Sequence, residues 1–235
     1  MTAAIHPSAT RAIPELENGD RLTRAEFERR YDAMPGLKRA ELIEGTVYMP
    51  SPVRHSRHSR PHSYLMAWLT CYETVTPGLE VGDNGSVRLD QDNEPQPDAY
   101  LMILPRCGGQ ARLSDDDFVE GAPELTAEIA SSSVSYDLGA KLHAYRRNGI
   151  REYVVWRVLD QQIDWLVLVE GRYEPLAPDA DGLLKSTGFP GLWLDPAALL
   201  NYDLTRVLAV LQQGLATPEH AAFVEKLARA GRPAP

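Results

Sequence analysis

The sequence has little cysteine and no long apolar run, and these two shortages exclude several classes of protein. Only Cys71 and Cys107 occur among 235 residues, and no CxxC pair is present. We therefore expect neither a disulfide framework nor a cysteine-based zinc site. No apolar run approaches the roughly 18 to 20 residues that span a bilayer, and the start of the chain lacks the layout of a signal peptide. The expectation is a cytoplasmic protein with no membrane partner.

Motifs for several common chemistries are also missing. The sequence contains no G-x-x-x-x-G-K-[ST] phosphate loop and no G-x-G-x-x-G dinucleotide fingerprint. The serines at 131–133 lack the G-x-S-x-G pattern, so a serine hydrolase is not expected. Basic charge is scarce too, because 24 Lys and Arg stand against 33 Asp and Glu, a net charge of −9. This balance opposes attraction to a polyanion, although Arg54, Arg57 and Arg60 form a local basic patch.

The hydrophobic pattern predicts an α/β (α+β) fold with a mixed sheet flanked by helices. Alternating or β-branched segments predict strands over residues 40–50, 86–89, 99–104, 124–130, 151–158, 162–169 and 173–176. Helical periodicity predicts helices over residues 23–32, 55–75, 136–148, 197–200, 204–215 and 218–227. We expect a flexible N-terminal arm, a main domain and a C-terminal helical extension packed on the core, over residues 1–20, 21–178 and 179–235.

Two carboxylates and a lysine form the most informative pattern. Asp98 begins one predicted strand, and Glu128 lies inside the next, the apolar run LTAEIA. On neighbouring strands two carboxylates can point to one face and share a cation, and a glutamate buried in an apolar strand needs such a partner. Asp137, Lys141 and Tyr145 recur every four residues and would share a helix face. If this face covers the sheet, Lys141 could orient or activate a water or neutralise charge on a phosphate.

Other polar groups have simple structural interpretations beside functional ones. His55, His58 and His62 could hold a transition metal on one helix face, but a polar helix start is the simpler interpretation. The acidic run at 115–117 suits a solvated turn better than a metal site. Asp137 and Lys141 alone would suit a surface salt bridge.

Several motifs occur together in an order that resembles one family. They are AELIEGTVYMPSPVRH, QPDAYLMI and GAPELTAEIASSSVSYDLGAKLHAYRRNGIREYVVW. Over about residues 23–176 the chain resembles the large bacterial family of restriction-endonuclease-like proteins in the PD-(D/E)XK nuclease superfamily. The resemblance implies a restriction-endonuclease-like fold for residues 21–178. It also implies a metal-dependent endonuclease that hydrolyses phosphodiester bonds, with DNA as the expected nucleic-acid partner.

The resemblance makes Asp98 the motif aspartate and Glu128 the motif glutamate, both metal ligands. In the standard motif a lysine stands two residues after the glutamate, where this chain has Ala130. In this family the lysine function is generally assigned to the following helix, which implies Lys141. Hard oxygen donors favour Mg²⁺, with Mn²⁺ as an alternative.

The resemblance assigns roles to further residues. Glu41 matches the upstream acidic position of the catalytic set, with Glu44 the less favoured choice. His55, after the PSP turn, is assigned to substrate binding, and we place Tyr145 with it because it shares the helix face of Lys141.

A second hypothesis stays open beside the nuclease. Ala130 and the negative net charge would also fit a catalytically inactive nuclease fold that serves as a nucleic-acid-binding or dimerisation module. A homodimer is compatible with either hypothesis. Leu192, Trp193, Leu199 and Leu200 could form an exposed apolar surface, although burial within one chain is the commoner outcome.

Overall fold

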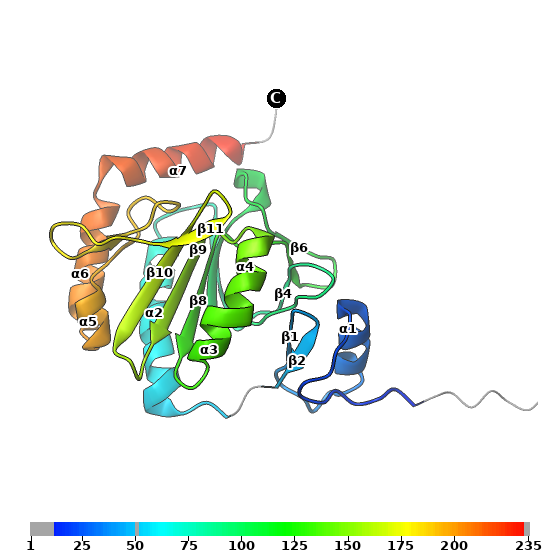
Figure 1. Ribbon diagram of the computed structural model, residues 1–235. Coiled ribbons are helices and arrows are strands. Elements are labelled where there is room, and N and C mark those ends of the chain that lie inside the picture. Colours follow the sequence, from blue (N-terminus) through cyan, green and yellow to red (C-terminus); the bar gives the residue numbers. More distant parts are fainter. Residues whose placement is uncertain (1–11, 50–51, 233–235) are drawn as a thin grey trace, which may run out of the picture.

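The computed structural model describes residues 12–49 and 52–232, and its centre is a six-stranded mixed sheet (Figure 1). The strand order is β11-β10-β9-β8-β5-β3, with only β8 and β9 parallel. In chain order these strands are β3 Leu79–Asp83, β5 Ala99–Ile103, β8 Leu125–Ala130, β9 Glu152–Arg157, β10 Gln162–Val169 and β11 Arg172–Pro175. The predicted mixed sheet is therefore confirmed.

Three small sheets flank the large one. They are the hairpin β1–β2, the three-stranded sheet β4-β7-β6 and the pair β12–β13. Their strands are β1 Glu41–Ile43, β2 Thr46–Tyr48, β4 Val87–Arg88, β6 Arg112–Leu113, β7 Val119–Glu120, β12 Leu184–Lys185 and β13 Trp193–Leu194. The hairpin turns at Glu44 and Gly45, within the single strand predicted over residues 40–50, and both residues have positive φ.

The helices match the predicted ones, with two local interruptions. They are α1 Arg24–Asp32, α2 Arg60–Glu73, α3 Val134–Tyr136, α4 Leu142–Asn148, α5 Pro196–Leu200, α6 Leu204–Leu215 and α7 Pro218–Ala230. Wide π turns, η1 His55–Ser59 and η3 Asp137–Lys141, precede α2 and α4, and a 3₁₀ turn, η2 Pro105–Cys107, follows β5. Among the described residues, no helix is both long and apolar enough to cross a membrane.

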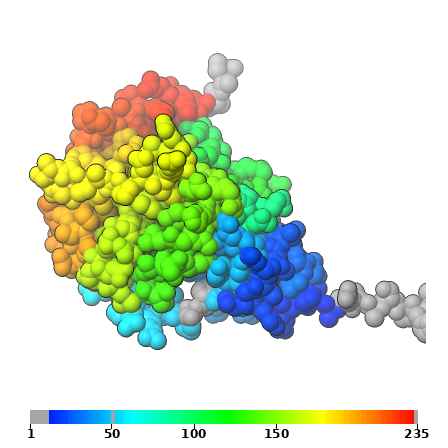
Figure 2. Space-filling model, viewed as in Figure 1, coloured from blue at the N-terminus to red at the C-terminus, as the bar shows by residue number. Residues whose placement is uncertain are grey.

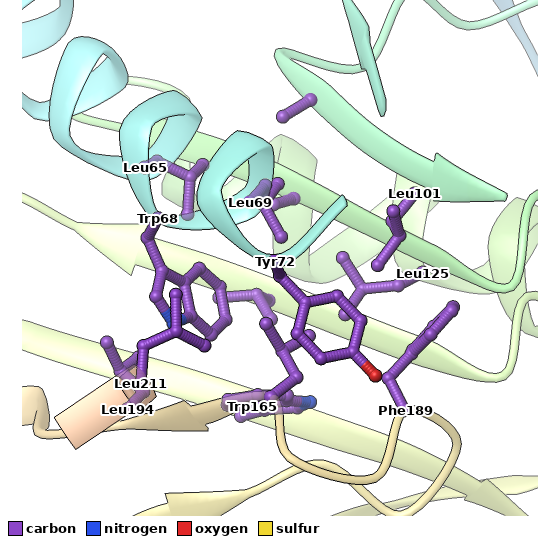
Figure 3. Packing of buried hydrophobic residues seen from close by; sticks show 14 of the residues in the cluster. Leu65, Trp68, Leu69, Tyr72, Leu101, Leu125, Trp165, Phe189, Leu194 and Leu211 are labelled. Atoms are coloured by element: carbon purple, nitrogen blue, oxygen red, sulfur yellow. The ribbon is translucent and has the colours of Figure 1, made fainter. Parts of the chain in front are cut away.

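Helix α2 covers one face of the sheet, and its apolar stripe forms the centre of the main core (Figures 1 and 3). Figure 3 shows Trp68 and Tyr72 of α2 directed toward strand residues and toward Trp165 and Phe189. Trp68 is fully buried, and its ring meets that of Trp165 edge to face with 5.6 Å between centroids. Removing so large a buried ring typically destabilises a protein by about 3 to 5 kcal/mol. The helical stripe predicted over residues 55–75 thus holds the fold together.

The C-terminal segment contributes to this same core. Leu194 from β13 and Leu211 from α6 lie beside α2 in Figure 3, and both are fully buried. Leu192 and Leu199 are 0% and 1% exposed. They therefore do not form the exposed apolar surface that was considered for dimerisation, because the chain covers them itself.

The beginning of the described chain is also packed. Leu16 is 3% exposed and lies in a small cluster with Phe27, Leu42 and Val47, while Gly19 donates its backbone N–H to the carbonyl of Val47. An apolar side chain and a backbone hydrogen bond thus fasten Leu16 and Gly19, within the arm expected over residues 1–20, to the hairpin. Residues 1–11 of that arm lie outside the described residues.

The other face of the sheet carries the polar site. Side chains alternate along β8, so Leu125, Ala127 and Ile129 face α2, and the residues between them face α4. Ala130 packs there with Tyr145 of α4 in a second apolar cluster. Glu128 belongs to this α4 face.

Candidate active site

The strand register brings Asp98 and Glu128 together. Ala99 of β5 pairs with Ala127 of β8 in an antiparallel ladder, so one further step places Asp98 opposite Glu128. Alternation along both strands then directs the two carboxylates to the same face. Each carboxylate is 3% exposed, so its charge is stable only if neighbouring groups pair or hydrogen-bond with it.

Asp98 is held by one backbone group and two basic side chains. Its Oδ2 accepts a hydrogen bond from the N–H of Ile129 at 2.8 Å. Its Oδ1 accepts from Nε2 of His58 at 3.1 Å and from Arg39 at 3.4 Å. Burial alone would raise the pKa of Asp98, but the hydrogen bond and charge of His58, the charge of Arg39 and the Ile129 N–H outweigh it and lower the pKa to about 2. Asp98 is therefore an anion in neutral solution.

Lys141 lies between two further carboxylates. Its Nζ is 2.8 Å from Oε1 of Glu128 and 2.9 Å from Oε1 of Glu41, and the residue is 1% exposed. Although burial lowers the pKa of this amine, the charges of Glu128 and Glu41 raise it well above the ordinary value. Burial raises the pKa of Glu128 to about 8 against the opposing charge of Lys141, and burial also raises the pKa of Asp137. The single ammonium group of Lys141 is thus shared by the carboxyl groups of Glu41 and Glu128.

A break in the helix sets the position of Lys141. The sequence predicts one regular helix over residues 136–148, but Gly139 has φ −114° and ψ −106°, outside the helical region. The chain therefore widens to a π turn over Asp137–Lys141, a feature often found at functional sites. Asp137 is 3% exposed, so the surface salt bridge considered for Asp137 and Lys141 is wrong, because the π turn directs both residues inward.

Tyr145 lies behind Glu128. It is fully buried, and its hydroxyl donates to Oε1 of Glu128 at 2.9 Å. Tyr145 does not line the cavity that lies above these carboxylates, so its contact is with the Glu128 carboxylate and not with the cavity. His55 is exposed on η1 and does not line the cavity either.

The carboxylates and Lys141 form the floor of a cavity of about 740 Å³. One wall comes from the segment around β2 and η1, and the other from the serine-rich turn after β8 and the start of α3. Figure 2 shows the blue N-terminal segment against the green segment that carries α3 and α4. The residues that line it include Arg39, Tyr48, Arg54, Arg57, His58 and Tyr136.

The donor set fits a hard divalent cation bound by few protein ligands. Within the described part of the chain, no group of three or more His, Cys, Asp and Glu residues is arranged to hold a metal ion. Four carboxylates line the cavity, and Asp98 and Glu128 are the two brought opposite each other by the strand register. Mg²⁺ typically uses one or two carboxylates and completes its shell with water and phosphate oxygens. The transition-metal site considered for His55, His58 and His62 is not formed, because His58 and His62 bind Asp98 and Asp83 instead.

Sequence reasoning thus selected four residues that the structure brings together, Glu41, Asp98, Glu128 and Lys141. It gave no role to Arg39, and it weighed His58 only as a metal ligand. Arg39 lies two positions before Glu41, and this spacing in an extended segment could have placed it on the same face. His58 lies one helical turn after His55, the histidine to which the substrate role was assigned instead.

Comparisons with known proteins give a family for the chain and a solved structure with a similar fold. Residues 24–197 match the model of a family described as "Uma2: Putative restriction endonuclease". Among solved structures, the chain is similar to one described as a putative nuclease belonging to DUF820 from Anabaena variabilis, with a TM-score of 0.51 and 16% identity over 73% of this chain and 97% of that chain. This similarity shows the fold, which confirms the restriction-endonuclease-like expectation. No curated protein matches the chain.

Proposed function

The chain belongs to the Uma2 family of restriction-endonuclease-like proteins, and from this premise we propose that it is a metal-dependent endonuclease that hydrolyses phosphodiester bonds in DNA. The observation that carries the proposal is the meeting of Asp98, Glu128 and Glu41 with Lys141 at the floor of one cavity. Phosphodiester hydrolysis depends mainly on stabilising charge in the transition state, and this cluster concentrates charged groups where water is largely excluded.

Asp98 and Glu128 are the proposed ligands of Mg²⁺, with Mn²⁺ as a substitute. A bound ion of this kind supplies Lewis-acid activation of water and stabilises negative charge on phosphate oxygens. The protein's own contribution is to hold the ligands still. Ile129 and His58 fix the two oxygens of Asp98, while Tyr145 and Lys141 fix Oε1 of Glu128. Tyr145 is thus proposed as a positioning residue, in place of the substrate-binding role expected from its helix face.

Lys141 takes the place of the lysine that the standard motif has two residues after the glutamate. That position is Ala130, which packs tightly under α4 with Tyr145 and Tyr153. Lys141 reaches Glu128 from the helix side instead, and its ammonium lies at the cavity floor. There it can orient the attacking water by hydrogen bonding and stabilise negative charge that builds on the phosphate.

Cleavage of plasmid and oligonucleotide DNA with Mg²⁺ or Mn²⁺ tests the proposal. We expect Asp98→Asn and Lys141→Ala to lose on the order of a hundredfold to a thousandfold in rate. Asp115→Asn is the control, because this exposed aspartate lies in the acidic turn away from the cavity and should leave the rate unchanged.

A wild-type protein that neither cleaves DNA nor binds a divalent cation would support the inactive-fold hypothesis instead. The substrate contact of His55, the domain limits, a homodimer and a cytoplasmic location stay predictions.

A further inference from the structure

We propose that the cavity takes single-stranded DNA in preference to duplex, with Arg54 and Arg57 contacting backbone phosphates and the rings of Tyr48 and Tyr136 stacking on a base. This inference rests on the function proposed for the same site and names its substrate class. Four observations carry it: the depth of the carboxylates, two arginines without ion pairs, an aromatic pair on the wall, and the limited volume.

The proposed catalytic side chains are almost completely buried, which disfavours contact with a stiff DNA duplex. Asp98 and Glu128 are each 3% exposed and Lys141 is 1% exposed, at the bottom of a cavity of about 740 Å³. Duplex DNA has a persistence length of roughly 150 base pairs, so bending or unpairing it to bring one linkage onto these residues costs free energy. A single strand bends freely and can lower one phosphodiester linkage to the floor.

The arginines at the mouth differ from the other clustered arginines of the molecule. Arg54 and Arg57 are exposed and line the cavity, and neither forms an ion pair with another residue that the structure describes. A second cavity of about 340 Å³ is also arginine-rich, but a carboxylate pairs with each of Arg24, Arg88 and Arg112. Guanidinium groups without a carboxylate partner are available to phosphate, the anion that their planar donors match. The chain has a net charge of −9, and these two arginines favour the approach of a polyanion to this cavity over the second one.

The wall of the cavity carries an aromatic platform. Tyr48 of β2 and Tyr136 of α3 lie with their ring centroids 4.3 Å apart and their planes tilted by 43°. Both are half-buried and line the cavity. Proteins that bind single strands combine a basic groove for the backbone with aromatic rings for unstacked bases. A paired base inside a duplex presents no free face to such a ring.

Fluorescence anisotropy with labelled oligonucleotides tests the inference without catalysis. The probes are one fluorescein-labelled single strand and its duplex of equal length, titrated with Asp98→Asn protein in Mg²⁺ and with wild-type protein in EDTA. We expect the single strand to bind roughly tenfold or more tightly than the duplex under both conditions. Two conditions are used because the first changes a residue of the site and the second leaves the whole chain as it is.

Substitutions then assign the contacts. The double variant Arg54→Ala with Arg57→Ala should weaken single-strand binding by roughly tenfold or more and reduce the slope of log K against log salt by about 1.4, because each phosphate contact contributes about 0.7. The matched control, Arg112→Ala with Arg172→Ala, removes the same charge from exposed positions outside this cavity and should change neither quantity. Tyr48→Leu should weaken binding roughly tenfold, and Tyr48→Phe should not.

Equal or tighter binding of the duplex, no binding of either probe, or unchanged binding by the arginine double variant would overturn the inference. The proposed function is judged separately by metal-dependent cleavage with wild-type protein. Cleavage of duplex DNA combined with duplex-preferring binding would reject the single-strand preference and keep the endonuclease.

Discussion

The two ends of the central sheet bury carboxylates in different ways. At one end, Glu152 of β9 is 0% exposed and accepts hydrogen bonds only from uncharged groups, the indole N–H of Trp165, the hydroxyl of Ser186, the N–H and hydroxyl of Thr187, and the N–H of Gly188. Glu124, just before β8, accepts from the N–H groups of Ile103 and Gln110. Neither glutamate forms an ion pair with a residue in the described part of the chain.

At the other end of the same strands, charged groups surround the carboxylates. Lys141 contacts Glu128 and Glu41, and Arg39 and His58 contact Asp98. A cage of neutral donors satisfies an anion completely and leaves nothing for a ligand, whereas the carboxylates of this cluster line a cavity that a ligand can enter. The difference teaches that burial of a glutamate in a strand does not by itself mark a functional site.

The largest effect is expected for Lys141→Met, which leaves two buried carboxylates without their shared cation. The free energy of unfolding should fall by about 3 to 5 kcal/mol, as is typical when one member of a buried ion pair is removed. Urea denaturation measures the change, and Lys226→Met at an exposed position is the control. Wild-type stability in the Lys141 variant would mean that the ammonium does not hold the cluster together.

Replacement by glutamine should affect Glu152 and Glu128 in different ways, lowering stability at Glu152 and abolishing cation binding at Glu128. Glu152→Gln places an amide against five donor groups and should lower the free energy of unfolding by about 2 to 4 kcal/mol, while divalent-cation binding by the folded protein persists. Glu128→Gln removes one carboxylate from a cluster that has too many, so stability should change by less than about 1 kcal/mol while cation binding is lost. Denaturation and calorimetry on both variants check this, and a reversal of the two patterns would exchange the roles of the two ends.

The sequence alone predicts the elements on which this comparison rests, but not their partners. The strands around Glu128 and Glu152 follow from local apolar patterns, and the register then fixes which face each residue occupies. The reasoning that Glu128 needs a cation leads to Lys141, yet the same reasoning would have flagged Glu152, which is satisfied by neutral donors. Local patterns cannot separate the two cases, because all donors to Glu152 except Trp165 come from a loop more than 30 positions later in the chain.

Other features escaped prediction for related reasons. Strand β3 is a half-buried edge strand whose only partner in the sheet is β5, and its apolar alternation is limited to Leu79 and Val81. The hydrogen bonds from Arg39 and His58 to Asp98 span 59 and 40 positions. The π turn at Gly139 moves Lys141 from its place in a regular helix, and the helical periodicity of a sequence does not predict such a break.

A further buried carboxyl group, that of Glu94, makes stability depend on pH. It is 1% exposed, its Oε2 has no partner among the described residues, and burial together with nearby Glu28 raises its pKa to about 8. The folded state therefore keeps a proton that the unfolded state releases near its ordinary value of 4.5. Its contribution to the free energy of unfolding should thus fall by about 1 to 3 kcal/mol between pH 5 and pH 8. Glu94→Gln should remove this part of the pH dependence, and an unchanged profile in denaturation experiments would contradict the assignment.

The smallest effect is expected for Gly139→Ala. Nothing lies within 4 Å of an added Cβ, so the substitution acts only through the backbone, whose ψ of −106° an alanine adopts with strain. Stability should fall by about 1 kcal/mol, and the nuclease rate should fall further as Lys141 shifts. Gly36→Ala, also in open space, is the matched control. A regular helix with full activity in the Gly139 variant would show that the π turn is dispensable.

A crystal structure of the wild-type protein soaked with Mn²⁺ tests the central claim most directly, because anomalous scattering locates the ion without assumptions. The account predicts one manganese peak in the cavity, within coordination distance of a carboxylate oxygen of Asp98 and one of Glu128, and none beside Glu124 or Glu152. An empty cavity at saturating Mn²⁺, or a peak bound by other residues, would contradict it.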